Sequence, residues 1–154
     1  MIALRAQRTF DAPREAVFAA WTNPEVLKRW WASEPGWRSP SAEVDLRVGG
    51  RYRLSMGDPH SGAVHTVTGE YTEVRPPERL AYTWAWEGDP PEMQGSAGTL
   101  VTVEFAEADG RTTVTVVHAG FATEQARDLH AGGWRGCLDS LEGRVFPTNG
   151  GQAP

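Results

Sequence analysis

Six segments in the middle of the chain alternate apolar and polar residues, and one long amphipathic segment follows them. The alternation runs through "AEVDLRVGG", "RYRLSM", "VHTVTGEYTEV", "RLAYTWAWE", "TLVTVEFAE" and "TTVTVVHAGF". A period of two is typical of β-strands with one face in a core and the other in solvent. Such strands form antiparallel sheets that are covered on one side. The predicted buried face comprises Val44, Leu46, Val48, Tyr52, Leu54, Met56, Leu80, Tyr82, Trp84, Trp86, Val101, Val103, Phe105, Val114, Val116 and His118.

The segment from Thr123 to about Val145 supplies the cover, because it reads as one long helix. Thr123 is a suitable N-cap. Three glycines, Gly132, Gly133 and Gly136, interrupt this helix, and each costs up to about 1 kcal/mol relative to alanine. Either the helix passes very close to the sheet there, or side-chain space is left open. The residues at helical spacing are Leu129, Trp134, Cys137, Leu138, Leu141 and Val145.

The N-terminal part completes the order of elements. Residues 2–10 alternate like a strand, and residues 13–21 and 24–31 predict two short helices, with Asn23 as an N-cap. Asp109-Gly110 predicts a hairpin, and Gly49-Gly50 a second tight connection. The sequence thus predicts an α+β fold, β-α-α-β6-α, in which a curved antiparallel sheet wraps around the long C-terminal helix. We expect one domain over 1–146 and a flexible tail over 147–154.

Composition and charge exclude several classes of protein. The 154 residues are 40% apolar, which suits one globular domain, and the formal net charge is −5 without any Lys/Arg block. We therefore expect no nucleic-acid partner and no membrane partner. Cys137 is the only cysteine, and no apolar run suggests a signal peptide or a spanning helix. We expect a cytoplasmic protein, with monomer and homodimer both open.

Five segments in the expected order resemble the START-like (SRPBCC) helix-grip superfamily, also described as Bet v 1-like. They are "TFDAPREAVFAAWTNPEVLKRWW", "VGGRYRLSM", "GEYTEVRPPERLAYTWAWE", "TLVTVEFAEADGRTTVTVVHAGF" and "GGWRGCLDSLEGRV". Within that superfamily they look like the branch related to activators of the heat-shock-protein-90 ATPase. The resemblance implies a deep cavity between sheet and C-terminal helix, roofed by the two short helices. It also implies apolar ligands for many members and catalysis for some.

Aromatic rings and histidines are the candidate site residues. The rings of Trp30, Trp31, Tyr82, Trp84, Trp86 and Trp134 predict the walls of a ligand pocket. His65, His118 and His130 are candidate polar anchors. The alternative is that these rings fill a solid core and that the histidines are structural, and for His118 the turn before the long helix favours that role.

The sequence indicates no metal site and no cofactor. The histidines at 60, 65, 118 and 130 lack the spacing of metal ligands, and no phosphate-binding glycine loop is present. The loop over residues 87–98 fits either a lid or a solvated connection. Three functions stay open: a binder of a small hydrophobic or aromatic molecule, a cyclase, aromatase or hydrolase-like enzyme, and an interaction module in stress response or chaperone regulation.

Overall fold

A computed structural model describes residues 1–148, so most of the predicted tail lies outside the described residues. Seven strands form one sheet in the order β1-β7-β6-β5-β4-β3-β2, and every neighbouring pair is antiparallel. The predicted fold and element order are confirmed. The elements are β1 (Ile2–Phe10), α1 (Arg14–Thr22), α2 (Pro24–Trp30), β2 (Ala42–Val44), β3 (Arg51–Gly57), β4 (Val64–Arg75), β5 (Arg79–Trp86), the 3-10 helix η1 (Pro91–Met93), β6 (Thr99–Ala108), β7 (Arg111–Phe121) and α3 (Glu124–Arg144).

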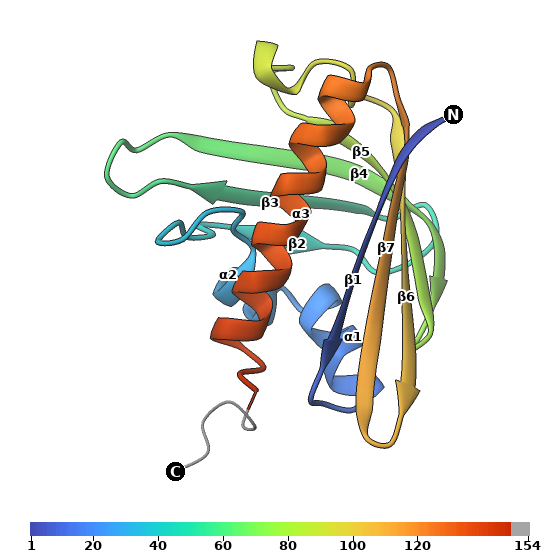
Figure 1. Cartoon of the computed structure of the whole chain (residues 1–154). Helices are drawn as coiled ribbons and strands as arrows, with labels where there is room; N and C mark the ends of the chain where they lie inside the picture. The colour runs from blue at the N-terminus through green and yellow to red at the C-terminus, as the bar shows by residue number, and fades with distance from the viewer. Residues whose placement is uncertain (149–154) are drawn as a thin grey trace.

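The sheet curls, and α3 passes across it. In Figure 1, β1, β6 and β7 run steeply down the page, whereas β3 and β4 run across it with α3 in front of them. Inward residues line up across strands in register: Leu4 faces His118, His118 faces Val101, and Val101 faces Tyr82. Period-two packing therefore places one continuous buried row beneath the helix.

Local signals set the turns and the helix ends. Asp109 and Gly110 have φ values of 55° and 75° and connect β6 to β7, as the hairpin signal predicts. The Asn23 side chain accepts a hydrogen bond from the Glu25 backbone N–H at 2.9 Å and caps α2. The Thr123 hydroxyl accepts one from the Ala126 N–H at 3.0 Å and caps α3.

The predicted strand over residues 42–50 is wrong beyond Val44. Its continuation turns back instead, with the Arg47 N–H donating to the Asp45 carbonyl and the Gly50 N–H to the Arg47 carbonyl. Leu46 and Val48 are therefore exposed, by 37% and 63%. The predicted tight connection at Gly49-Gly50 is present. It requires glycine at position 50, because a side chain there would overlap the Asp45 carbonyl oxygen.

Of the two purposes that the sequence left open for the glycines of α3, open side-chain space is found at Gly132 and Gly133, whereas the close approach at Gly136 is not to the sheet. A Cβ on Gly136 would overlap the carbonyl oxygen of Ser33, so the helix here passes close to the segment after α2 rather than to the sheet. Gly132 and Gly133 meet no backbone atom within 4 Å and instead border open space. That space also explains why Leu129, which shares the helical spacing of the buried residues, is 45% exposed.

Replacing Gly136 by alanine should lower the free energy of unfolding by about 1–2 kcal/mol, because backbone overlap outweighs the helix-propensity gain of about 1 kcal/mol. Gly133→Ala is the matched control: the nearest atom to its Cβ is the Ser33 Cβ at 4.0 Å, so this variant should be neutral or more stable. Urea unfolding of the two variants makes the comparison. Equal shifts would contradict the close approach at Gly136.

Candidate functional site

Five indole rings pack together at the centre of the molecule. This indole cluster consists of Trp21, Trp30, Trp31, Trp84 and Trp134, and each is at most 4% exposed. Ring centroids lie 5.0 Å apart for Trp21 and Trp30, 5.8 Å for Trp31 and Trp134, and 5.5 Å for Trp84 and Trp134. The middle of the domain is therefore solid, as the core interpretation of the rings predicts.

A cavity of about 510 Å³ lies beside this cluster, next to the N-terminal half of α3. Its other walls come from β3, β4 and β5, from the segment after α2 and from the β5–β6 loop. In Figure 1 these are the elements around the upper half of α3, with the β5–β6 loop at the top. The lining residues are Trp31, Ser33, Glu34, Trp37, Met56, His65, Trp84, Trp86, Glu92, Met93, Asp128, Leu129, His130, Gly132, Gly133, Trp134 and Cys137.

The helices α1 and α2 do not roof the cavity, which corrects what the resemblance implies. No residue of α1 or α2 lines this cavity in the described chain, although the resemblance implies that both helices cover it. Their large rings, Trp21 and Trp30, belong to the solid indole cluster instead. The roof is formed by the segments at residues 31–37 and 87–98, which follow α2 and β5.

Six of the nine predicted site residues line the cavity, and three do not. Trp30 is fully buried, and its indole N–H donates to the Ala20 carbonyl at 2.9 Å. The Tyr82 hydroxyl accepts from the Trp21 indole N–H at 3.2 Å within the core. His118 is fully buried behind Trp134. The six that line the cavity are Trp31, Trp84, Trp86, Trp134, His65 and His130.

His118 is held as a neutral imidazole by its hydrogen bonds. The Trp134 indole N–H can only donate, and it points to His118 Nδ1 at 3.1 Å, so the His118 proton lies on Nε2. Nε2 donates to the Thr99 hydroxyl at 2.7 Å, and that hydroxyl donates to the Ser96 carbonyl at 2.6 Å. Burial, with His130 nearby, lowers the pKa of His118 to about 3. His118 thus connects Thr99, at the start of β6, to Trp134 of α3. This is the structural role that the sequence left open for it.

His130 repeats this arrangement at the cavity wall. It accepts from the Trp86 indole N–H at Nε2, 3.0 Å away, and Nδ1 donates to the Ala126 carbonyl at 2.8 Å. Burial lowers the pKa of His130 as well. Both nitrogens are in use, so His130 fixes the Trp86 ring in the wall and has no free lone pair to act as a base.

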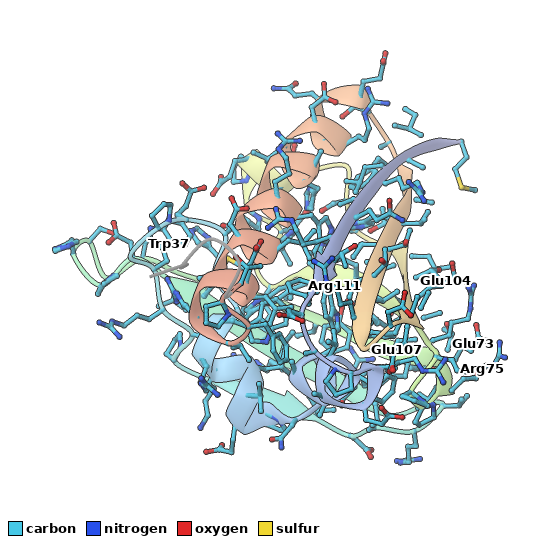
Figure 2. All side chains as sticks on the ribbon, turned by 60° about the horizontal axis from the view of Figure 1, so that its bottom comes forward. Trp37, Glu73, Arg75, Glu104, Glu107 and Arg111 are labelled. Atoms are coloured by element: carbon cyan, nitrogen blue, oxygen red, sulfur yellow. The ribbon has the colours of Figure 1, made fainter. Side chains whose placement is uncertain are left out.

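His65 and Trp37 form a second part of the wall. Their rings stack with centroids 5.7 Å apart and planes 16° apart. Within residues 1–148 the His65 ring makes no hydrogen bond, so its nitrogens can meet a ligand. Trp37 was missed as a site residue because it lies in an irregular segment without periodicity, although it follows Trp30 and Trp31 closely in the sequence. Figure 2 shows Trp37 on the opposite side of the molecule from Glu73, Arg75 and Glu104.

The loop over residues 87–98 forms one wall instead of a plain solvated connection. It contains η1, and the Gly95 carbonyl accepts from the Ala122 N–H at 2.8 Å, which fastens the loop to the start of α3. The Ser96 hydroxyl donates to the Met93 carbonyl at 2.7 Å. Glu92 and Met93 consequently border the cavity.

Two donors in the wall have no acceptor. The indole Nε1 atoms of Trp31 and Trp84 are buried without a hydrogen-bond partner in the part of the chain described.

Burial raises the pKa of the Cys137 thiol to about 12, so this cysteine is a protonated core residue and not a nucleophile. No group of three potential metal ligands occurs among the described residues.

Comparisons with solved structures identify the architecture as the helix-grip fold. A protein of Chromobacterium violaceum is 27% identical with a TM-score of 0.79, over 96% of this chain and 100% of that one. An AHSA1-like protein of Aeromonas hydrophila is 29% identical with a TM-score of 0.78, over 94% and 92%. An HSP90 activator of Plasmodium falciparum is 24% identical with a TM-score of 0.71, over 96% and 99%, and shares the fold.

Sequence comparison gives the family. None of the curated proteins matches the chain. The part of the chain that the structure describes contains no helix with the length and apolarity to span a membrane. The model of the family described as Activator of Hsp90 ATPase homolog 1-like protein matches residues 11–145. With this match over most of its length, the chain belongs to the Activator of Hsp90 ATPase homolog 1-like family within the START-like superfamily.

Proposed function

We propose that this protein binds a small apolar or aromatic molecule in the cavity beside α3. The observation that carries the proposal is the cavity itself, whose volume of about 510 Å³ falls within the range of small-molecule sites. Its wall contains five indole rings and two thioethers, and polar groups, among them His65, can orient a ligand. This combination is typical of sites that recognise ligands by desolvation and shape.

The rigidity of the wall supports the same proposal. Trp84 and Trp134 belong to the indole cluster, and Trp86 is held by its hydrogen bond to His130. A wall that is already ordered loses little side-chain entropy when a ligand binds. Each 100 Å² of apolar surface covered by the ligand would contribute about 2.5 kcal/mol.

The rival function, a protein-interaction module, has weaker support in the molecule. Only the names of relatives, such as the HSP90 activator of Plasmodium falciparum, suggest a part in chaperone regulation. Such a module would need a dry interior and a contiguous apolar patch. Leu46 and Val48 are exposed in the connection between β2 and β3, Val64 on β4 and Leu100 on β6, whereas the interior contains the cavity. We therefore favour ligand binding.

Titration with the neutral fluorescent probe N-phenyl-1-naphthylamine tests the proposal. We expect saturable binding with enhanced probe emission and a change in tryptophan fluorescence. Gly133→Leu should weaken binding at least tenfold, because the new side chain would occupy the cavity. Gly143→Leu is the matched control on the same helix, where a side chain meets open space away from the cavity. Absence of saturable binding, or equal binding by both variants, would contradict the proposal.

A further inference from the structure

We propose that the natural ligand of this cavity is an organic cation, an ammonium group attached to an apolar or aromatic body. This inference rests on the proposed binding function and specifies its ligand class. It is carried by the juxtaposition, within one cavity, of aromatic rings and carboxylates without any lysine or arginine in the wall. The lining residues all belong to the described part of the chain, so the composition of this wall is defined.

The absence of cationic side chains from the wall is local to this cavity. The chain has 15 lysines and arginines in total. A smaller hollow between β1 and α3 is lined by Arg5, Arg8 and Arg135, and another beside β3 by Arg51 and Arg53. A ligand with a positive charge would thus meet no lysine or arginine in the wall of the large cavity, and an anionic ligand would find neither of these side chains there as a counter-ion.

The aromatic part of the wall suits a cation. Indole has the strongest attraction for cations among the aromatic side chains, and ammonium groups bind over its face within about 6 Å of the centroid. Trp37 and Trp86 are only partly buried, and both line the cavity. The thioethers of Met56 and Met93 add soft, polarisable surface that accommodates alkyl groups on nitrogen.

The carboxylates around the opening supply negative charge. Glu34 and Glu92 are exposed and border the cavity from the two roof segments, and neither forms an ion pair within residues 1–148. Asp128 also borders the cavity, but its carboxylate already accepts from Arg127 at 2.9 Å. Glu34 and Glu92 are therefore the two acidic groups whose charge is left for a ligand. Because both are exposed, their contribution should be screened by salt.

The histidine in the inner wall does not offset this charge. His130 uses Nδ1 as a donor to the Ala126 carbonyl and Nε2 as an acceptor from Trp86. Protonation of Nε2 would break the hydrogen bond with the Trp86 indole. His130 is thus a neutral part of the wall near pH 7 and adds no positive charge beside Glu34 and Glu92.

Three isosteric probes test the inference by isothermal titration calorimetry: benzyltrimethylammonium, the neutral hydrocarbon neopentylbenzene and the anion benzylsulfonate. A merely hydrophobic cavity would bind neopentylbenzene best, because that probe is the most poorly hydrated. We expect the reverse, with the cation bound at least tenfold more tightly than the hydrocarbon, equivalent to about 1.4 kcal/mol, and no binding of the anion. A higher salt concentration should lower the affinity for the cation and leave the affinity for the hydrocarbon unchanged.

Charge-neutral variants assign the effect to the carboxylates. The double variant Glu34→Gln/Glu92→Gln should bind benzyltrimethylammonium about three- to tenfold more weakly, and its affinity for neopentylbenzene should stay unchanged. Glu15→Gln/Glu70→Gln removes the same charge from two exposed positions away from the cavity and should leave both affinities unchanged. Equal or tighter binding of the hydrocarbon or of the anion would overturn the inference and leave ligand binding intact. Failure of all three probes would overturn the inference and count against ligand binding as well.

Discussion

Replacing Trp134 by alanine should lower the free energy of unfolding by about 3–5 kcal/mol, the usual cost of emptying a large buried aromatic site. Trp134 is 2% exposed and contacts Trp21, Trp31 and Trp84. The substitution also removes the donor of His118 Nδ1 and leaves that buried nitrogen without a partner. Chemical denaturation monitored by far-UV circular dichroism measures the change.

Two further variants separate the parts of this effect. Trp134→Phe keeps an aromatic ring but loses the indole N–H, so it should cost about 1–3 kcal/mol, mainly through the unpaired His118 nitrogen. Trp37→Ala should cost about 1 kcal/mol or less, because Trp37 is half-buried and stacks on His65 alone among the aromatic rings described. The same variant should also bind N-phenyl-1-naphthylamine more weakly, because Trp37 lines the cavity. If Trp134→Ala and Trp37→Ala destabilise the fold equally, the division into solid cluster and cavity wall is wrong.

The fold could be predicted from the sequence because its signals are local. Alternation decides which face of a strand is buried, so Tyr52, Val101 and Val116 lie inward as expected. The Asp109-Gly110 pair and the Thr123 cap also act within a few residues of their own positions. The same reasoning failed at Leu46 and Val48, where a turn ends the strand, and the Gly49 N–H in this turn donates to the Tyr71 carbonyl on the distant strand β4.

The candidate site was only partly predictable, because parity indicates a direction and not a neighbour. Tyr82 and Trp84 have the same parity on β5, yet Tyr82 meets Trp21 in the core whereas Trp84 reaches the cavity. Contacts between elements far apart in the sequence decide this difference. Glu34 and Trp37 lie in an irregular segment, and Glu92 lies in a 3-10 helix of three residues that is too short to show a period, so no pattern singles them out.

The stability of the protein should fall as the pH is lowered from about 6.5, well before its carboxylates are protonated. The pKa of His118 is about 3 in the folded chain and near its ordinary value of 6.5 when unfolded. Between these values the unfolded chain binds more protons than the folded one, so acid favours unfolding. The slope should approach about 1.4 kcal/mol per pH unit, which gives a loss of about 2–3 kcal/mol by pH 4.5. His130, whose pKa is also lowered, adds to the same trend.

Urea denaturation of two histidine variants between pH 7 and pH 4.5 assigns this slope. His118→Gln removes the titrating ring that Thr99, Trp134 and His130 surround, so it should be less stable at pH 7 but lose much less stability toward pH 4.5. His60→Gln, at an exposed position between β3 and β4, should keep the slope of the unmodified protein. The carboxylates of Asp58, Glu73 and Glu87 have lowered pKa values, so the stabilisation they provide is lost only below this window. If His118→Gln left the dependence of stability on pH unchanged, protonation of the buried imidazole would not be what destabilises the protein in acid. The hydrogen-bonded chain Trp134–His118–Thr99 would then not be what holds the start of β6 to α3.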